Sequence, residues 1–144
     1  MLFRSVFAAV SLAAAAAFVW LGVYRSSLRF HAGLNAGKIV GLCMMAFSLA
    51  VYPVLGALLG DHYPAAPTFG LPCPTTIFTF GVLLMAARPV PGMLVIFPLA
   101  WAVIGSFAAF LLDVTQDLAL VPTATFGVYL LLEHFAQRGN RRRQ

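Results

Sequence analysis

The side chains that could do chemistry gather in and around the segment from His62 to Thr76, HYPAAPTFGLPCPTT. They offer a thiol, hydroxyls, an imidazole and carboxylates, which are groups that bind small solutes and ions. The candidate ligand-binding residues are Cys73, Thr75, Thr76, Asp61, His62 and Asp117. Four prolines and a glycine interrupt the same segment, so its backbone cannot continue as one regular helix.

The rest of the chain is more apolar than a soluble domain can be. Of its 144 residues, 62% are hydrophobic and 9% are charged, which leaves too little polar surface to cover a soluble domain of this size. The intervals 39–60 and 89–112 carry no charged residue. Each suits a helix that crosses about 30 Å of hydrocarbon, for which about 20 residues are needed. The composition therefore predicts that most of the chain is surrounded by lipid.

We predict an all-α fold, a polytopic membrane bundle of about five transmembrane helices. The expected spans are residues 2–24, 37–60, 68–87, 93–112 and 118–135. Residues 1–136 would form a single transmembrane domain, and residues 137–144 a basic cytoplasmic tail. Because the connections are short, consecutive helices should be antiparallel neighbours.

The first apolar run, MLFRSVFAAVSLAAAAAF, also resembles a signal peptide. The basic residues Arg25, Arg29 and Lys38 follow it closely, and the positive-inside rule keeps such a segment in the cytoplasm. We therefore expect a retained membrane helix.

Charge predicts the orientation of the bundle. With five spans, eight of the nine Lys and Arg residues fall on one side, and only Arg4 falls on the other. The opposite connections hold Asp61, Asp113 and Asp117. This asymmetry predicts a protein of the bacterial inner (plasma) membrane with its N-terminus outside and its C-terminus in the cytoplasm. The arginine-rich tail is then a topology anchor at the lipid surface, not a site for nucleic acid.

The third span should be broken. Proline favours the first position of a helix, so Cys73 is the expected N-cap and Pro74 the expected first residue. From Pro74 to Ala87 the helix would rise about 21 Å, less than the hydrocarbon layer of about 30 Å. Residues 67–72 would then enter the bilayer as extended or re-entrant chain. A helix that starts at this depth turns free N–H groups toward a pocket, where transporters place substrate sites.

The same residues also have a purely structural interpretation. Threonines in membrane helices often return hydrogen bonds to their own backbone, as Thr75 and Thr79 would do. A small cysteine such as Cys73 often only fills space. Glu133 and His134 are expected to end the last helix at the cytoplasmic interface.

Metal and redox chemistry receive little support. His62, Cys73 and an aspartate are possible ligands, but their spacing matches no metal-binding motif. The predicted topology places His31 and His134 on the other side, and it separates Cys43 from Cys73 by too much helix for a disulfide. We assign no metal, cofactor or catalytic residue, and the sequence favours a protein that is not an enzyme.

Two stretches, HYPAAPTFGLPCPTTIFTFG and FPLAWAVIGSFAAFLLDVTQDLALV, resemble a family of bacterial multi-pass membrane proteins catalogued only as a domain of unknown function. The resemblance covers the second helix onward. The proline, cysteine and threonine run of the family maps onto residues 72–76, and its Gln-Asp pair maps onto Gln116 and Asp117. The resemblance implies further helices before the first span, so that the chain would be a short member or a fragment. It implies no activity.

Three functions remain open. The first is a site that binds or translocates a small solute or ion, for which a chain of this length would work as a homo-oligomer. The second is a non-catalytic membrane subunit or assembly partner, in which the broken span is a packing plug. The third is a thiol-redox or metal-handling membrane protein.

Overall fold

The computed structural model describes residues 9, 12–25, 28–30, 33, 35–59, 72–112 and 115–141. Throughout these ranges the regular structure is helical, as predicted. An apolar helix, Leu12–Gly22, comes first and overlaps a π-helical turn. The elements that follow are η1 (Val19–Tyr24), α2 (Ala36–Ala46), η2 (Phe47–Val51), α3 (Tyr52–Leu58), α4 (Pro72–Met85), α5 (Gly92–Leu112), η3 (Thr115–Ala119) and α6 (Leu120–Arg141).

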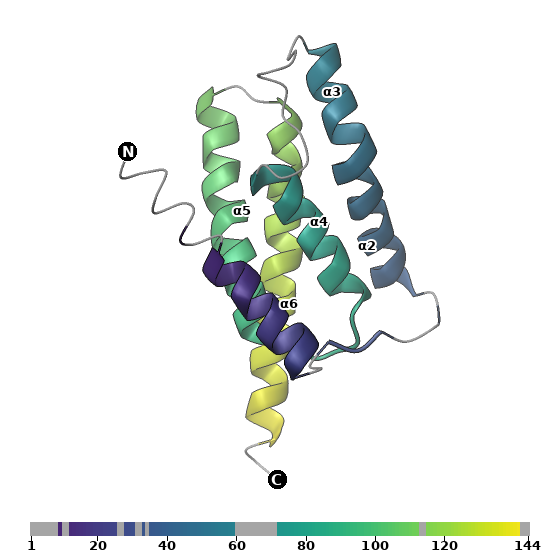
Figure 1. Cartoon of the computed structure of the whole chain (residues 1–144), viewed down its shortest axis with the longest axis vertical. Helices are drawn as coiled ribbons and strands as arrows, with labels where there is room; N and C mark the ends of the chain where they lie inside the picture. Colours follow the sequence, from purple (N-terminus) through teal and green to yellow (C-terminus); the bar gives the residue numbers. More distant parts are fainter. Residues whose placement is uncertain are drawn as a thin grey trace.

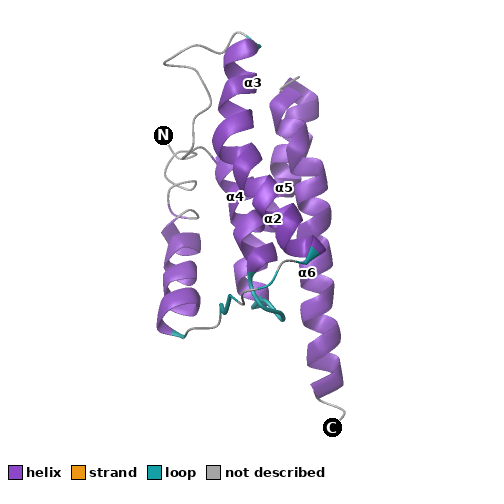
Figure 2. Ribbon diagram, turned by 90° about the vertical axis from the view of Figure 1, so that its right-hand side faces the viewer, coloured by secondary structure: helices purple, strands orange, loops and turns teal. Residues whose placement is uncertain are grey.

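The helices stand side by side in a bundle, with α4 at its centre (Figure 1). α4 packs against α2 on one side and against α5 and α6 on the other. Figure 2 shows the first helix on the outside of the bundle. Three helices are long and apolar enough to cross a membrane: Ala36–Leu58, Gly92–Leu111 and Asp117–Asn140. Leu12–Gly22 and Pro72–Met85 are shorter apolar helices.

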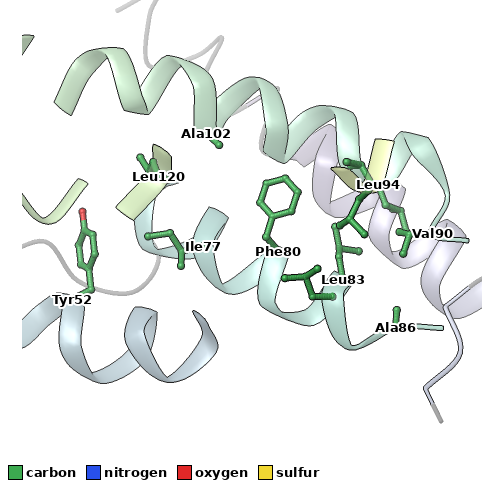
Figure 3. Packing of buried hydrophobic residues seen from close by; sticks show 12 residues of the cluster. Tyr52, Ile77, Phe80, Leu83, Ala86, Val90, Leu94, Ala102 and Leu120 are labelled. Atoms are coloured by element: carbon green, nitrogen blue, oxygen red, sulfur yellow. The ribbon is translucent and has the colours of Figure 1, made fainter. Parts of the chain in front are cut away.

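The core of the bundle is built around α4. Phe80 and Leu83 of this helix are fully buried, and Ile77 is nearly so. They meet Leu94 and Ala102 of α5, with Tyr52 and Leu120 at one end of the cluster (Figure 3). The shortest of the four main rods therefore takes the central place, with the longer rods packed around it.

Two glycines bring α2 and α4 into close contact. A Cβ atom at Gly41 would lie 2.6 Å from the carbonyl oxygen of Gly81, and a Cβ at Gly81 would lie 2.7 Å from that of Gly41. No side chain fits into either space. Small residues at a helix crossing let two backbones approach closely, which is a common way of joining helices in membranes.

The second rod is continuous but contains an irregular turn. Asn35 caps α2 by accepting a hydrogen bond from the Lys38 amide at 2.9 Å. The π-helical turn η2 then precedes Pro53, which stands at the start of α3. Proline removes a backbone donor and crowds the preceding turn, and a π-type turn relieves that crowding without ending the helix.

Two helix boundaries differ from the predicted ones. α4 begins at Pro72, so Cys73 is not its N-cap but lies in its first turn. Prolines at positions 72 and 74 are both compatible with this first turn, because the N–H groups of a first turn have no acceptor within the helix. α6 continues to Arg141, past the predicted end at Phe135. Hydropathy marks where the apolar run stops, and a helix can extend further into water.

Candidate functional site

An aspartate, a tyrosine and a cysteine from three different rods meet at one end of the core. The hydroxyl of Tyr52, the first residue of α3, donates a hydrogen bond to the carboxylate of Asp117 in η3. The Cys73 thiol, in the first turn of α4, lies beside both groups. Tyr52 is 2% exposed. We call these three residues the Tyr52–Cys73–Asp117 cluster.

A second contact shows how deep the described start of α4 lies beside the second rod. The hydroxyl of Ser48 in η2 donates to the carbonyl oxygen of Pro74, and the Ser48 side chain is buried. Ser48 precedes Leu58, the end of α3, by ten residues, which is about 15 Å of helix. The described part of α4 therefore starts well inside the length of the neighbouring rod, as Figure 1 shows. The predicted break before Pro74 falls mostly on residues 60–71, which lie outside the described residues.

The first described turn of α4 and the turn η3 meet at the cluster. Cys73 lies in the first turn of α4, and Asp117 lies in the first turn of η3, which leads into α6. A helix start carries N–H groups without partners and the positive end of the dipole. An acidic side chain is favourable there, which helps to explain how a carboxylate is tolerated beside a buried tyrosine.

A glycine of α5 leaves the room that the cluster needs. A Cβ atom at Gly105 would lie 2.5 Å from Leu120 Cδ1 and 4.0 Å from Cys73 Sγ. Leu120 is fully buried. Gly105 thus allows α5 to close one side of the site while the start of α6 packs against it.

The threonines of α4 differ in how their hydroxyl groups are bonded. Thr79 donates a hydrogen bond to the Thr75 carbonyl oxygen at 2.8 Å, which is the structural role expected for threonine in such a helix. The Thr75 hydroxyl oxygen itself is buried and has no partner within the described part of the chain. Thr76 is 6% exposed and packs inside the bundle.

The structure brings together part of the predicted site. Cys73 and Asp117 meet, and Thr75 and Thr76 belong to the same first turns of α4. Asp61 and His62 lie outside the described residues. The sequence analysis missed Tyr52. In the sequence, Tyr52 is distinguished only as a polar aromatic residue inside an apolar run and directly before a proline. This pattern is too common to identify a site by itself.

Metal-binding groups do not assemble in the described ranges. Within them, no three His, Cys, Asp or Glu side chains lie close enough to hold one ion. Cys43 and Cys73 are both free thiols, in agreement with the prediction that no disulfide joins them.

At the opposite end of the bundle, Glu133 and His134 act differently from the prediction. Instead of ending the last helix, Glu133 forms an ion pair with Arg88, and His134 Nδ1 lies 2.9 Å from the carbonyl oxygen of Val90. The Arg88 guanidinium also lies 5.0 Å from the ring centre of Tyr129. These contacts attach the connection between α4 and α5 to the side of α6.

Comparison with known proteins gives one match. The model of a family of unknown function matches residues 2–142, which includes the first helix as well as the segments that carry the resemblance. No curated protein and no solved structure matches the chain significantly.

Proposed function

The chain belongs to the family of unknown function DUF6064, and we propose that it is a multi-pass integral membrane protein that binds a small solute or ion at the Tyr52–Cys73–Asp117 cluster. The placement in a membrane rests on the helices. Three of them have the length and composition of a span, and we count the shorter Leu12–Gly22 and α4 as the other two. The protein would lie in the inner membrane of a bacterium.

The outside of the bundle supports this placement. Large apolar side chains are exposed along every long rod, including Leu58 at 77% and Leu111 at 83%. Soluble monomers rarely expose so continuous an apolar surface. In a bilayer the same surface would face lipid tails at no cost.

The observation that carries the binding site is the placement of Asp117. Its carboxylate lies against the hydroxyl of a buried tyrosine, between helices and about 9 Å of helix away from the end of α3. Ionisable residues at membrane depth are costly and usually mark a path or a site. A carboxylate next to a hydroxyl and a thiol would accept a small cation or a solute that donates hydrogen bonds.

The charge of small thiol reagents tests this proposal. In a Cys43→Ser background Cys73 is the only thiol. We expect a cationic methanethiosulfonate reagent to modify Cys73 faster than an anionic reagent of similar size, because Asp117 attracts cations. Asp117→Asn should abolish this preference. Glu133→Gln is the matched control, since Glu133 lies at the other end of α6, and it should leave the preference intact. Equal rates for both reagents in the parent protein would contradict the proposal.

A non-catalytic membrane subunit is the second candidate, and the Ser48 contact favours it. That hydrogen bond ties the start of α4 to η2 with both groups buried, which suits a rigid packing plug. A plug would leave Cys73 unreactive toward reagents of either charge. The labelling experiment therefore separates the two functions.

A further inference from the structure

A cavity of about 770 Å³ opens at the end of the bundle opposite the Tyr52–Cys73–Asp117 cluster. Its walls are the start of α2 and the middle of α6, and the end of α4 forms its base. The volume lies within the range of about 300–1,000 Å³ found for ligand pockets. None of the proposed solute-binding residues lines it.

Two cations, Lys38 and Arg88, line this cavity. The Lys38 ammonium donates to the Gly33 carbonyl oxygen at 2.7 Å, which holds it at the start of α2. Arg88 lies in the connection between α4 and α5 and contacts both walls: its Nη2 lies 3.6 Å from the place of a Cβ at Gly37, and its guanidinium stacks on Tyr129 of α6. Glu133, which does not line the cavity, forms an ion pair with Arg88 and offsets its charge. No carboxylate belongs to the described residues that line the cavity.

Much of the lining of the cavity is apolar. Val40 of α2, Leu84 of α4 and Phe126 of α6 belong to it. A free anion would gain nothing from these walls. A ligand with an anionic head and a hydrocarbon body would match both parts of the cavity.

The cavity also lies at the basic end of the bundle, where an anionic ligand would be attracted. Arg25, Lys38, Arg88 and Arg138 all lie at this end of the bundle, at the ends of four different helices. The amide of Ala87, which lines the cavity, donates to the carbonyl oxygen of Arg29. Basic pockets between membrane helices on the cytoplasmic side bind anionic lipid headgroups.

We propose that this cavity binds one anionic phospholipid, with its phosphate at Lys38 and Arg88 and an acyl chain along Val40, Leu84 and Phe126. The inference rests on the proposed placement in a membrane. It does not depend on the Tyr52–Cys73–Asp117 cluster, so the failure of either site leaves the other standing.

The test is a lipid titration of the purified full-length protein in neutral detergent micelles. Phosphatidylglycerol should raise the unfolding temperature saturably, and phosphatidylcholine should not. Lys38→Gln should weaken the apparent affinity for phosphatidylglycerol about fivefold, the value of one cation at an anionic lipid surface. Lys38→Arg should restore it. Arg138→Gln, which removes an exposed cation outside the cavity, should leave the affinity unchanged.

A second variant keeps the test decisive if Lys38→Gln does not fold. Thr125 is exposed, lines the cavity and bonds only to its own helix, at Val121. Thr125→Phe should obstruct part of the cavity without a change of charge and weaken lipid binding as well. Equal weakening by Arg138→Gln and Lys38→Gln would overturn the proposal, because it would show diffuse attraction to the basic surface. An equal stabilisation by inorganic phosphate alone would overturn the assignment of a lipid.

Discussion

A single hydrogen bond does much to define the candidate site. Tyr52 and Asp117 are 65 residues apart in the sequence, and they connect the second rod to the last one. Both belong to segments of unusual geometry, because Tyr52 follows a π-helical turn and Asp117 lies in a 3-10 turn. Such irregular turns often occur at functional sites. Here they place two polar side chains in contact inside an apolar bundle.

We expect Tyr52→Phe to lower the free energy of unfolding by about 1.5–3 kcal/mol, the usual range for a hydrogen bond to a charged group. The measurement is equilibrium unfolding in micelles for Tyr52→Phe, Asp117→Asn and the double variant. A coupling energy should appear in this cycle, since the two side chains contact each other.

Tyr129→Phe is the matched control, because Tyr129 is 54% exposed and its ring can still pack under Arg88. Its effect should stay within about 0.5 kcal/mol. Additive effects of Tyr52→Phe and Asp117→Asn would show that the two side chains do not interact.

At the scale of the elements, the crossing of α2 and α4 holds the bundle together. The Gly41–Gly81 contact allows the two backbones to touch, and Met45 closes the crossing from the α2 side. The same crossing sets the depth at which α4 begins. The position of Cys73 therefore depends on two glycines in the middle of the helices.

Gly81→Ala should destabilise the protein by about 1–3 kcal/mol, the cost of overpacking a tight contact. The new Cβ would lie 2.7 Å from both the Gly41 carbonyl oxygen and Met45 Cγ. Gly139→Ala is the control, since a Cβ there meets nothing within 4 Å. It should stabilise α6 by up to about 1 kcal/mol through helix propensity. Thermal unfolding of the two variants should thus shift in opposite directions, and a shift in the same direction would contradict the packing argument.

At the scale of the whole molecule, the two ends of the bundle differ in chemistry. One end carries the Tyr52–Cys73–Asp117 cluster. The other carries Lys38, the Arg88–Glu133 ion pair and the cavity between α2 and α6. A membrane protein with this polarity should insert with its basic end in the cytoplasm.

Reporter fusions after Gln144 test this orientation. A reporter that is active only in the cytoplasm should be active there, and one that is active only outside should be inactive. The opposite pattern would reverse the topology and would place the lipid-binding cavity in the outer leaflet. Fusing both reporters at the same residue controls for differences in expression.

Much of the element order could be predicted because it depends on local properties. The length of an apolar run indicates a helix that can cross a membrane. The charged residues between these runs indicate which helix ends lie on the same side of the bundle. The predicted break in the third span stays a prediction, because the residues before Pro72 lie outside the described part of the chain. The end of α6 could not be predicted in this way, because backbone hydrogen bonds continue past the apolar run. The segment around Asp61 and His62 lies outside the described residues.

By itself, the sequence determined the all-helical fold, the three helices that are long and apolar enough to cross a membrane, and the basic end, since each depends on residues close together in the chain. Only the tertiary structure decided that Asp117 meets Tyr52, that Arg88 pairs with Glu133 across 45 residues, and that Gly41 faces Gly81. The physical reason is that these contacts depend on how far each helix is rotated and shifted against its neighbours. That arrangement is chosen by the packing of all the helices together, which no single stretch of sequence contains.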